Sequence, residues 1–407
     1  MSDTIRPENH DEVVEALRAA LESGRALDVV GAGSRRALGA PGGAETRLDL
    51  SAISGITLYE PAELVLSAKA ATPMAEIEAA LSEKRQQLAF EPPDWSQLLG
   101  VDAGGNVSGT LGGVIACNLG GPRRIKAGAA RDHFLGFNAV SGRAETFKSG
   151  GRVVKNVTGF DLSKLMAGSY GTLAVMTAVT VKVLPAPEKT RTVLLFGADD
   201  GAAFKAMRDA LSSAHEIAAA AHLPAVTAKG SSVAYVANAG RSVTALRIEG
   251  PGASAEHRCK AVRELLAGYG ETEELHSMNT ATLWREIRDV LFFVGDATQV
   301  WRLSVPPASG AAVAAEILSH VNGRAYYDWG GGLVWLSLDP LPDAGAGIVR
   351  GAVAKSGGHA TLIRAADSVR AAVPVFQPQS DAVAGLGRRI KENFDPKNIL
   401  NPGRMGV

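Results

Sequence analysis

The segment from Gly100 to Gly121, GVDAGGNVSGTLGGVIACNLGG, constrains the fold of this chain more than any other feature because glycine occupies so many of its positions. Glycine lacks a Cβ atom and destabilises the interior of a helix or a strand. We therefore expect neither a helix nor an ordinary strand in this segment. We expect that its backbone passes close to another part of the chain or to a ligand.

A second glycine loop, GAGSRRALG at residues 31–39, follows a short apolar segment, ALDVV, that predicts a buried strand. Consecutive backbone N–H groups, one serine and two arginines are suitable donors for a phosphate. The loop is not a dinucleotide fingerprint of the G-x-G-x-x-G type, because Arg36 stands where the third glycine belongs, and no G-K-[ST] follows it. A tight loop without a ligand is the alternative interpretation when this motif is taken alone.

Composition limits the chemistry that the chain can perform by itself. The 407 residues predict two or three domains, and equal numbers of basic and acidic residues, 42 of each, argue against nucleic acid as a partner. The first residues do not form a signal peptide, and no apolar run approaches the length of a membrane span, so we expect no integral membrane segment and a cytoplasmic location. The two cysteines, Cys117 and Cys259, cannot hold an iron–sulfur cluster. Redox chemistry would therefore need a bound organic cofactor.

The order of elements changes after Pro185-Ala-Pro187. Strands at 190–196, 231–237 and 244–250 with helices at 202–211 and 255–268 give a β-α-β-β-α pattern. A second such pattern follows, with strands near 299–305, 325–329, 333–338 and 360–365 and helices near 311–321 and 346–356. Both predict an antiparallel sheet with helices on one face, which is the ferredoxin-like arrangement.

Three segments, in this order, resemble the vanillyl-alcohol-oxidase family of flavoproteins, which have a PCMH-type FAD-binding domain. They are GAGSRRALG, TLGGVIACNLGGPRRIKAGAARDHFLG at 110–136 and GGRVVKNVTGFDLSKLMAGSYGTLAVMTAVTVKVLP at 150–185, and FDPKNILNPGRM at 394–405 matches the family's C-terminal signature. The resemblance implies an α+β fold with a two-subdomain FAD-binding domain at 1–187. It further implies a ferredoxin-like substrate or cap domain at 188–376 and a segment at 377–407 that returns to the flavin.

The same resemblance implies which residues bind FAD. Those of the first loop would hold the pyrophosphate: Gly31, Ala32, Gly33, Ser34, Arg35 and Arg36. Those lining the phosphate path and the flavin edge would be Pro93, Thr110, Leu111, Gly112, Gly113, Cys117, Asn118 and Gly121. Gly159, Asp161, Gly171 and Val175 would shape the adenine end, and Asn401 with Pro402 would reach the isoalloxazine. For each glycine a tight turn is the alternative role, and for Asp161 a helix cap.

The first loop contains no histidine, the residue that attaches flavin covalently in some members of the family, so we expect non-covalent FAD. Other members attach flavin through a cysteine farther along the chain, but for Cys117 we favour the role of a small buried apolar side chain.

The second half of the chain lacks the metal motif of related 2-hydroxy-acid dehydrogenases, H-x-G-D-G-N-L-H. The matching stretch begins at Asp328 and ends at Trp335, so neither histidine is present, and we expect no metal site. Arg302 and His359 are the candidate catalytic residues: a guanidinium can bind a carboxylate, and an imidazole can accept a proton. A structural ion pair and a packing histidine are the alternatives. The pair Arg123-Arg124 could bind a substrate carboxylate, a flavin phosphate or the acidic face of a partner.

Within the family, GGPRR and VVKNVTGFDLSKLMAGSYGTL resemble the FAD-binding subunits of glycolate oxidases most. This implies oxidation of a small 2-hydroxy acid in a complex with a catalytic flavoprotein subunit and an iron–sulfur subunit, which would place the chain peripherally at the inner membrane. Whether this chain oxidises substrate itself or only holds FAD for a partner stays open. A self-sufficient alcohol or sugar oxidase of the same family is the alternative.

Overall fold

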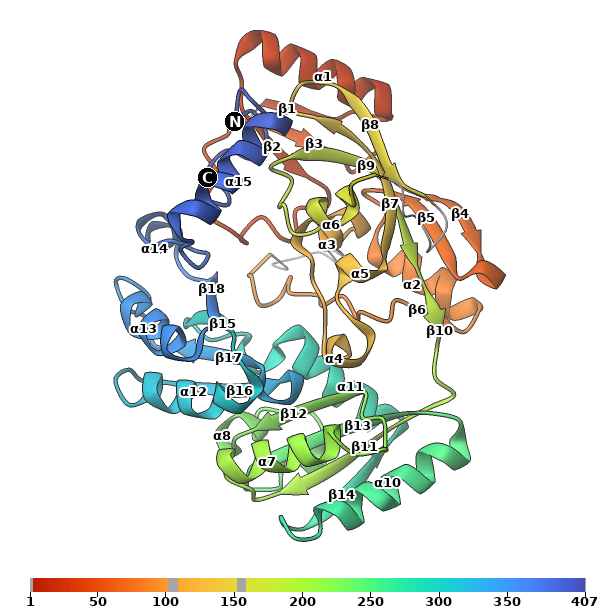
Figure 1. Ribbon diagram of the computed structural model, residues 1–407, viewed down its shortest axis with the longest axis vertical. Coiled ribbons are helices and arrows are strands. Elements are labelled where there is room, and N and C mark those ends of the chain that lie inside the picture. Colours follow the sequence, from red (N-terminus) through yellow and green to blue (C-terminus); the bar gives the residue numbers. More distant parts are fainter. Residues whose placement is uncertain (1–2, 102–108, 152–158, 407) are drawn as a thin grey trace. The chain divides into compact units, whose positions relative to one another are not determined.

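The computed structural model describes residues 3–101, 109–151 and 159–406, which form two compact units (Figure 1). Unit 1 comprises Met1–Gly120, Gly128–Ala186 and Pro374–Val407, and unit 2 comprises Gly121–Ala127 and Pro187–Val373. We had placed residues 121–127 in the first domain, whereas the structure groups them with unit 2. That residues 1–187 and 188–376 fold independently as separate domains stays a prediction.

Unit 1 contains a small parallel sheet and a larger antiparallel one. The parallel sheet has the order β1 (Asp3–Ile5), β3 (Thr46–Asp49), β2 (Leu27–Val30). The antiparallel sheet has the order β4 (Ile56–Glu60), β5 (Val65–Lys69), β9 (Ala174–Lys182), β7 (Phe134–Ser141), β8 (Thr146–Gly150). Val175, Val179 and Val181 alternate along β9, which pairs with both β5 and β7.

Helix α1 (His10–Ser23) covers the parallel sheet. The Asn9 side chain accepts the N–H of Glu12, and Gly24 ends the helix in the left-handed conformation. Val13 and Leu17 are buried in a cluster with Leu27, Leu48 and other apolar residues. The other elements of unit 1 are η1 (Pro61–Glu63), α2 (Met74–Glu83), β6 (Gln86–Gln87), α3 (Leu111–Cys117), α5 (Ala130–His133), α6 (Leu162–Met166), β10 (Leu184–Pro185) and α15 (Asp381–Phe394).

The prediction that no helix forms in the glycine-rich segment is wrong for its second part, because α3 spans Leu111–Cys117. The Thr110 side chain caps this helix by accepting the N–H of Gly113. A Cβ at Gly112 would lie 2.8 Å from the carbonyl oxygen of Ala70, so this glycine allows the helix to pack directly on neighbouring backbone. The expected close approach of backbone therefore occurs within a helix. Residues 102–108 of the segment, like 152–158 of the third family motif, lie outside the described residues.

Unit 2 is built on one eight-stranded antiparallel sheet made of two ferredoxin-like halves (green to blue in Figure 1). The first half contains β11 (Lys189–Phe196), α7 (Asp200–Leu211), β12 (Ala219–Leu223), β13 (Val243–Gly250), α10 (Gly252–Leu266) and β14 (Thr272–His276). The second contains β15 (Gln299–Ser304), α12 (Gly310–Leu318), β16 (Gly323–Asp328), β17 (Leu333–Leu338), α13 (Ala346–Ser356) and β18 (His359–Arg364). The order β14-β11-β13-β12-β16-β17-β15-β18 joins the halves at β12 and β16, where His222 pairs with Tyr327.

Two details of unit 2 differ from the prediction. Residues 231–237, expected as a strand, contain the short helix α9 (Ala234–Ala237), and the strand is β12, AAAHL. Every residue of β12 is buried, so its position between β13 and β16 overrides the weak strand propensity of alanine.

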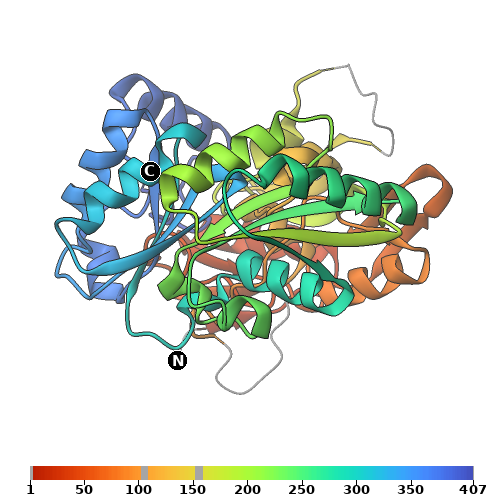
Figure 2. The same ribbon diagram turned by 90° about the horizontal axis from the view of Figure 1, so that it is seen from below.

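Helices also cover both faces of the first half of the sheet (Figure 2), not one. Helices α7 and α10 pack on the face that contains Val193 and Leu195, whereas Trp284 of α11 (Ser277–Asp289) donates to Thr192, which points to the opposite face. The remaining elements of unit 2 are α4 (Arg124–Ala127), α8 (Ala225–Ala228), η2 (Leu291–Phe293), η3 (Pro307–Ser309), η4 (Trp329–Gly331) and α14 (Asp367–Ala372).

Candidate functional site

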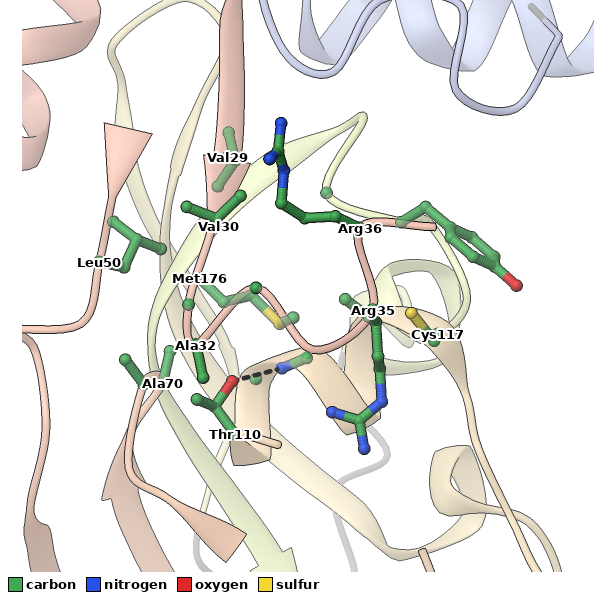
Figure 3. A pocket seen from close by; sticks show the side chains of 18 of the residues that line it. Val29, Val30, Ala32, Arg35, Arg36, Leu50, Ala70, Thr110, Cys117 and Met176 are labelled. Carbon is green, nitrogen blue, oxygen red and sulfur yellow. Dashed lines mark hydrogen bonds between the residues drawn. The ribbon is translucent and has the colours of Figure 1, made fainter. Parts of the chain in front are cut away.

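A cavity in unit 1 opens where β2 ends and the first glycine loop begins (Figure 3). It encloses about 750 Å³ of empty space, including the part open to solvent. The predicted residues that line it are Gly31, Ala32, Gly33, Ser34, Arg35, Arg36, Thr110, Gly112, Gly113, Cys117, Gly171 and Asn401. Segments that are far apart in the sequence therefore meet at one place.

The backbone of the glycine loop presents hydrogen-bond donors that the folded chain leaves unused. Among residues 3–101, 109–151 and 159–406, the N–H groups of Ala32, Gly33, Ser34 and Arg35 have no acceptor, whereas that of Arg36 donates to the Gly33 carbonyl. Gly33 has a φ of 76°, a conformation that favours glycine. Successive N–H groups in such a turn form a concave site for an anion.

Two arginines leave this loop in opposite directions (Figure 3). Arg36 is exposed and pairs with Asp28 at 2.6 Å. Arg35 is half-buried; it donates to the Pro93 carbonyl at 3.2 Å, and its buried Nε has no hydrogen-bond partner among the described residues. Burial lowers the pKa of Arg35, opposed in part by Cys117 and Asp94. A guanidinium remains charged even so, and an anion in the cavity would compensate that charge.

The glycines of α3 act through close packing rather than through their N–H groups. Gly112 donates to the Ala70 carbonyl at 2.7 Å, and Gly113 donates to the Thr110 side chain at 3.2 Å. A Cβ at Gly31 would lie 2.8 Å from Oγ1 of Thr110, so the loop and the start of α3 are in direct contact. Gly112 and Gly113 therefore line the cavity through their small size, because both N–H groups have intramolecular acceptors.

The C-terminal signature is held against the glycine loop by Asn401 and Arg404. The Asn401 side chain accepts the N–H of Val29 and donates to the Tyr170 carbonyl, both at 2.8 Å. Arg404 donates to the carbonyls of Arg35 and Arg36, both at 3.0 Å. These contacts fix the loop, and Arg404 had not been predicted although it lies within the FDPKNILNPGRM motif.

Other lining residues were also missed by the sequence reasoning: Val29, Val30, Leu50, Ala70, Ala71, Ala116, Tyr170, Ala174 and Met176. Most are small or apolar and lie in β2, α3 or β9 or directly after β5, so they carried no chemical signal. The period of β9 is the one signal that could have found Ala174 and Met176, because alternate residues of a strand share a face.

Several predicted residues lie outside the lining of the cavity. Val175 and Leu111 are buried in the core, Asn118 ends α3 in the left-handed conformation, and Asp161 caps α6 by accepting the N–H of Lys164. Gly159 is exposed with a φ of 82°. Pro93 acts through its carbonyl on Arg35, Pro402 follows Asn401, and Gly121 belongs to unit 2.

Cys117 lies in the cavity, where burial raises the pKa of its thiol, opposed in part by Arg35 and Arg404. A thiol held in its protonated form is a poor nucleophile. This favours the apolar packing role for Cys117 over covalent attachment.

In unit 2, the structure brings the two candidate catalytic residues to neighbouring strands. Arg302 of β15 pairs with Thr361 of β18, and Ser304 pairs with His359. Partial burial lowers the pKa of His359, and the charges of Arg302 and Arg124 lower it further, which favours the neutral form of the imidazole.

The residues at the positions of the metal motif have structural roles. Asp328 is buried and accepts the N–H of Trp329, and Trp335 is buried and stacks on Tyr326. In the described part of the chain, no three His, Cys, Asp or Glu side chains come together as metal ligands.

Comparison with known proteins identifies the family. Residues 3–150 match the model of an FAD binding domain. The chain is 33% identical to the glycolate oxidase subunit GlcE of Escherichia coli over 97% of this chain and 96% of that protein. The chain belongs to the GlcE family. A glycolate oxidase subunit GlcD of Bacillus subtilis is 36% identical over 30% of this chain and 25% of its own, and a D-lactate dehydrogenase of Archaeoglobus fulgidus is 30% identical over 53% and 44%.

Solved structures support the fold. A p-cresol methylhydroxylase aligns with a TM-score of 0.71 over 99% of this chain and 88% of its own at 13% identity, and an alkyldihydroxyacetonephosphate synthase aligns with 0.68 over 98% and 76% at 16% identity. The chain thus combines a PCMH-type FAD-binding fold with a ferredoxin-like antiparallel sheet, as predicted. No helix in the described ranges combines the length and apolar character that crossing a membrane requires.

This member of the GlcE family is an FAD-dependent oxidoreductase, and the cavity of unit 1 fits its cofactor. The free N–H groups of residues 32–35 and the buried charge of Arg35 suit a pyrophosphate. The small side chains at the end of β2, directly after β5 and in α3 leave room for a flat ring system and a ribose. When bound, FAD supplies a two-electron acceptor for the oxidation of a substrate.

Proposed function

We propose that this chain is the FAD-binding subunit of a glycolate oxidase complex and takes part in the oxidation of glycolate to glyoxylate, with the electrons passed to partner subunits. The observation that carries this proposal is the similarity to glycolate oxidase subunit GlcE over nearly the full length of both chains. Local similarity to a GlcD subunit and to a D-lactate dehydrogenase points to the same class of CH–OH substrate.

The residues of unit 1 have defined tasks in this function. The N–H groups of residues 32–35 bind the cofactor's pyrophosphate, and Arg35 neutralises its charge. Asn401 and Arg404 hold the loop in the binding conformation before the cofactor arrives. The cofactor is held without a covalent bond, because Cys117 is kept as a thiol and the loop contains no histidine.

Arg302 and His359 are the residues to which we assign substrate chemistry. Arg302 binds the carboxylate of the hydroxy acid, and neutral His359 accepts the proton of the substrate hydroxyl as hydride leaves the adjacent carbon. Oxidation of one glycolate to glyoxylate releases two electrons and two protons. No metal ion assists in this assignment.

The electrons must then leave to an external acceptor. The chain has two cysteines, too few for the ligands of an iron–sulfur cluster. We therefore propose two partners, a catalytic flavoprotein subunit and an iron–sulfur subunit, and a cytoplasmic location that is peripheral to the inner membrane through these partners.

The test is anaerobic reduction of the purified, FAD-loaded chain by glycolate, followed by its visible absorbance, with and without the flavoprotein partner. We expect only slow bleaching of the chain alone, because Arg302 and His359 would act there without a metal ion to polarise the substrate hydroxyl. We expect rapid bleaching in the complex. Rapid bleaching of the isolated chain that is lost in Arg302→Ala would show a self-sufficient oxidase, the alternative function.

A further inference from the structure

Four side chains of unit 2 gather at one place: Arg124, Arg302, Trp329 and His359, here called the arginine–tryptophan cluster. The guanidinium carbon of Arg124 lies 4.4 Å from the centre of the Trp329 ring, and that of Arg302 lies 5.1 Å from the same centre. Both arginines are half-buried, Trp329 is 8% exposed, and His359 is accessible to solvent. Two cations therefore share one indole ring.

The local fold fixes the position of Trp329 from two sides. It follows β16 directly and has a φ of 54°, a strained conformation for a tryptophan. Its backbone N–H donates to the buried carboxylate of Asp328 at 2.7 Å, and its Nε1 donates to the Gly121 carbonyl at 3.1 Å. Because an otherwise costly conformation is held by two hydrogen bonds, the position of this ring is specified rather than incidental.

Arg124 reaches the cluster from a part of the sequence far from the rest of unit 2. It lies in α4, three residues after Gly121, whose carbonyl binds the Trp329 ring. The neighbouring Arg123 forms a bidentate ion pair with Glu249 of β13, with Nε–O distances of 2.9 Å. These two anchors hold residues 121–127 on unit 2, so Arg124 is positioned before any ligand binds.

Arg302 and His359 lie on the opposite face of the sheet from helix α13. The preceding residue, Trp301, points toward α13: its Nε1 donates to the Ala344 carbonyl, and Arg350 of α13 lies over its ring. Successive residues of a strand point to opposite faces, so Arg302 points the other way. His359 pairs with Ser304 and shares the face of Arg302.

We infer that the arginine–tryptophan cluster is a binding site for the carboxylate of a small 2-hydroxy monocarboxylate. A guanidinium stacked on an aromatic ring keeps its N–H groups in its own plane, where they can donate in pairs to a carboxylate. Two guanidiniums stacked on one ring bring two positive charges to the same indole, and the charge of a carboxylate is attracted to both. The neutral imidazole adds a group that can hydrogen-bond to the hydroxyl.

The same geometry argues for a small acid rather than an acidic protein surface. The guanidiniums are half-buried and fixed by the indole ring, whereas protein-docking arginines project from the surface to meet extended partners. The inference rests on the proposed function in its choice of a hydroxy acid, and it adds Arg124 and Trp329 to the substrate site. Binding, however, can be measured without turnover.

The probe is 2-hydroxyisobutyrate, which carries the carboxylate and the hydroxyl but has no hydrogen on the hydroxyl-bearing carbon and so cannot be oxidised to a ketone. Isothermal titration of the FAD-loaded chain with this acid should give saturable binding, and the uncharged amide of the same compound should not bind. Arg302→Gln and Arg124→Gln should each weaken binding about ten-fold or more, because each removes a charge-assisted hydrogen bond. Arg302→Lys should also bind weakly, since a lysine keeps the charge but loses the fork.

Lys126→Gln is the matched control: it removes one positive charge from the same helix, where Lys126 pairs with Glu216 on the surface. Its affinity should stay within two-fold of the parent. Near-ultraviolet circular dichroism and FAD content should be unchanged in each variant that weakens binding. A variant that loses binding and also changes its spectrum has an altered fold. Its result supports the site only if Arg302→Lys loses affinity with a parent-like spectrum.

The outcomes separate this site from the proposed function. Unchanged affinity in both Arg302→Gln and Arg124→Gln would overturn the site, even if the complex oxidises glycolate. Binding that follows the predicted pattern supports the site, even if the complex fails to oxidise glycolate and the proposed function falls. Assembly with the partner that is lost in Arg124→Gln, together with no binding of the acid by the parent chain, would reassign the cluster to an acidic protein surface and overturn the inference.

Discussion

Replacing Lys391 by methionine should destabilise unit 1 strongly. Lys391 Nζ donates to the carbonyls of Thr172 and Leu400, at 2.7 and 3.0 Å, and to the Asp395 carboxylate at 2.6 Å. Lys391 is 7% and Asp395 1% exposed. Burial lowers the pKa of Lys391, whereas the hydrogen bond and charge of Asp395 raise it, so Asp395 stabilises the charge of the lysine.

The magnitude follows from what the substitution leaves behind. In Lys391→Met the Asp395 carboxylate stays buried without its cation, which costs about 3–5 kcal/mol. The carboxylate would keep the N–H groups of Ile399 and Leu400, at 3.0 and 2.8 Å, so the loss should not exceed this range. For a unit of this size the midpoint of thermal unfolding should fall by about 10 °C. The double variant Lys391→Met/Asp395→Asn removes both charges and should recover about half of the loss.

Flavin fluorescence, which increases when FAD leaves the protein, reports the unfolding of unit 1 during heating. Urea unfolding followed by the same signal gives the free energy. A loss below about 1 kcal/mol in Lys391→Met, or no recovery in the double variant, would refute the argument that the buried pair governs this region. The pair also positions Asn401 and Arg404, so Lys391→Met should bind FAD more weakly even below its unfolding temperature.

Further predictions concern the cofactor and the substrate chemistry. Acid precipitation of the holoprotein should release all of the yellow colour into the supernatant, and colour that remains in the pellet would show a covalent bond. Gly33→Asp and Gly113→Asp should each weaken FAD binding at least about 100-fold in a titration, because a carboxylate would enter the lining of the cavity. Gly159→Ala should change the affinity only a few-fold, because Gly159 is exposed and has open space for a Cβ. Because the pKa of His359 is lowered, the imidazole gains its proton only as the pH falls below about 6.5. The protonated imidazole can no longer accept a proton from the substrate. The rate of glycolate-dependent reduction in the complex should therefore fall as the pH falls through that range. His359→Gln should be slow and should lack this acidic decline in a stopped-flow pH profile, and an unchanged profile would exclude His359 as the proton acceptor.

Local patterns in the sequence predicted much of the fold because they report short-range physics. Gly24 ends α1, the valines of β9 alternate, and both ferredoxin-like halves follow from the order of apolar segments. Strand β12 was missed because its sequence, AAAHL, has no strand character, and only the strands on either side make it one. Sheet pairing decides such a segment, and pairing is not visible in a single sequence.

The sequence indicated which segments line the candidate site, but not the contacts among their side chains. The sequence indicated the first glycine loop because phosphate binding needs bare backbone N–H groups, and in the described part of the chain those of residues 32–35 have no acceptor. Helix α3 was not expected because its glycines disfavour a helix, and their close packing on neighbouring backbone depends on contacts that the sequence alone does not show. The meeting of Arg124 with Arg302 on Trp329 could not be foreseen, because it depends on residues 121–127 packing in unit 2.

The chain order of unit 1 has a consequence for how the protein is made. The glycine loop is translated early, but Asn401 and Arg404, which brace it, emerge from the ribosome only after the whole of residues 187–373. A nascent chain that stops anywhere within unit 2 therefore lacks the residues that hold the loop in shape. Retention of flavin thus reports completed synthesis, and prematurely terminated chains should emerge colourless and should be open to proteolysis.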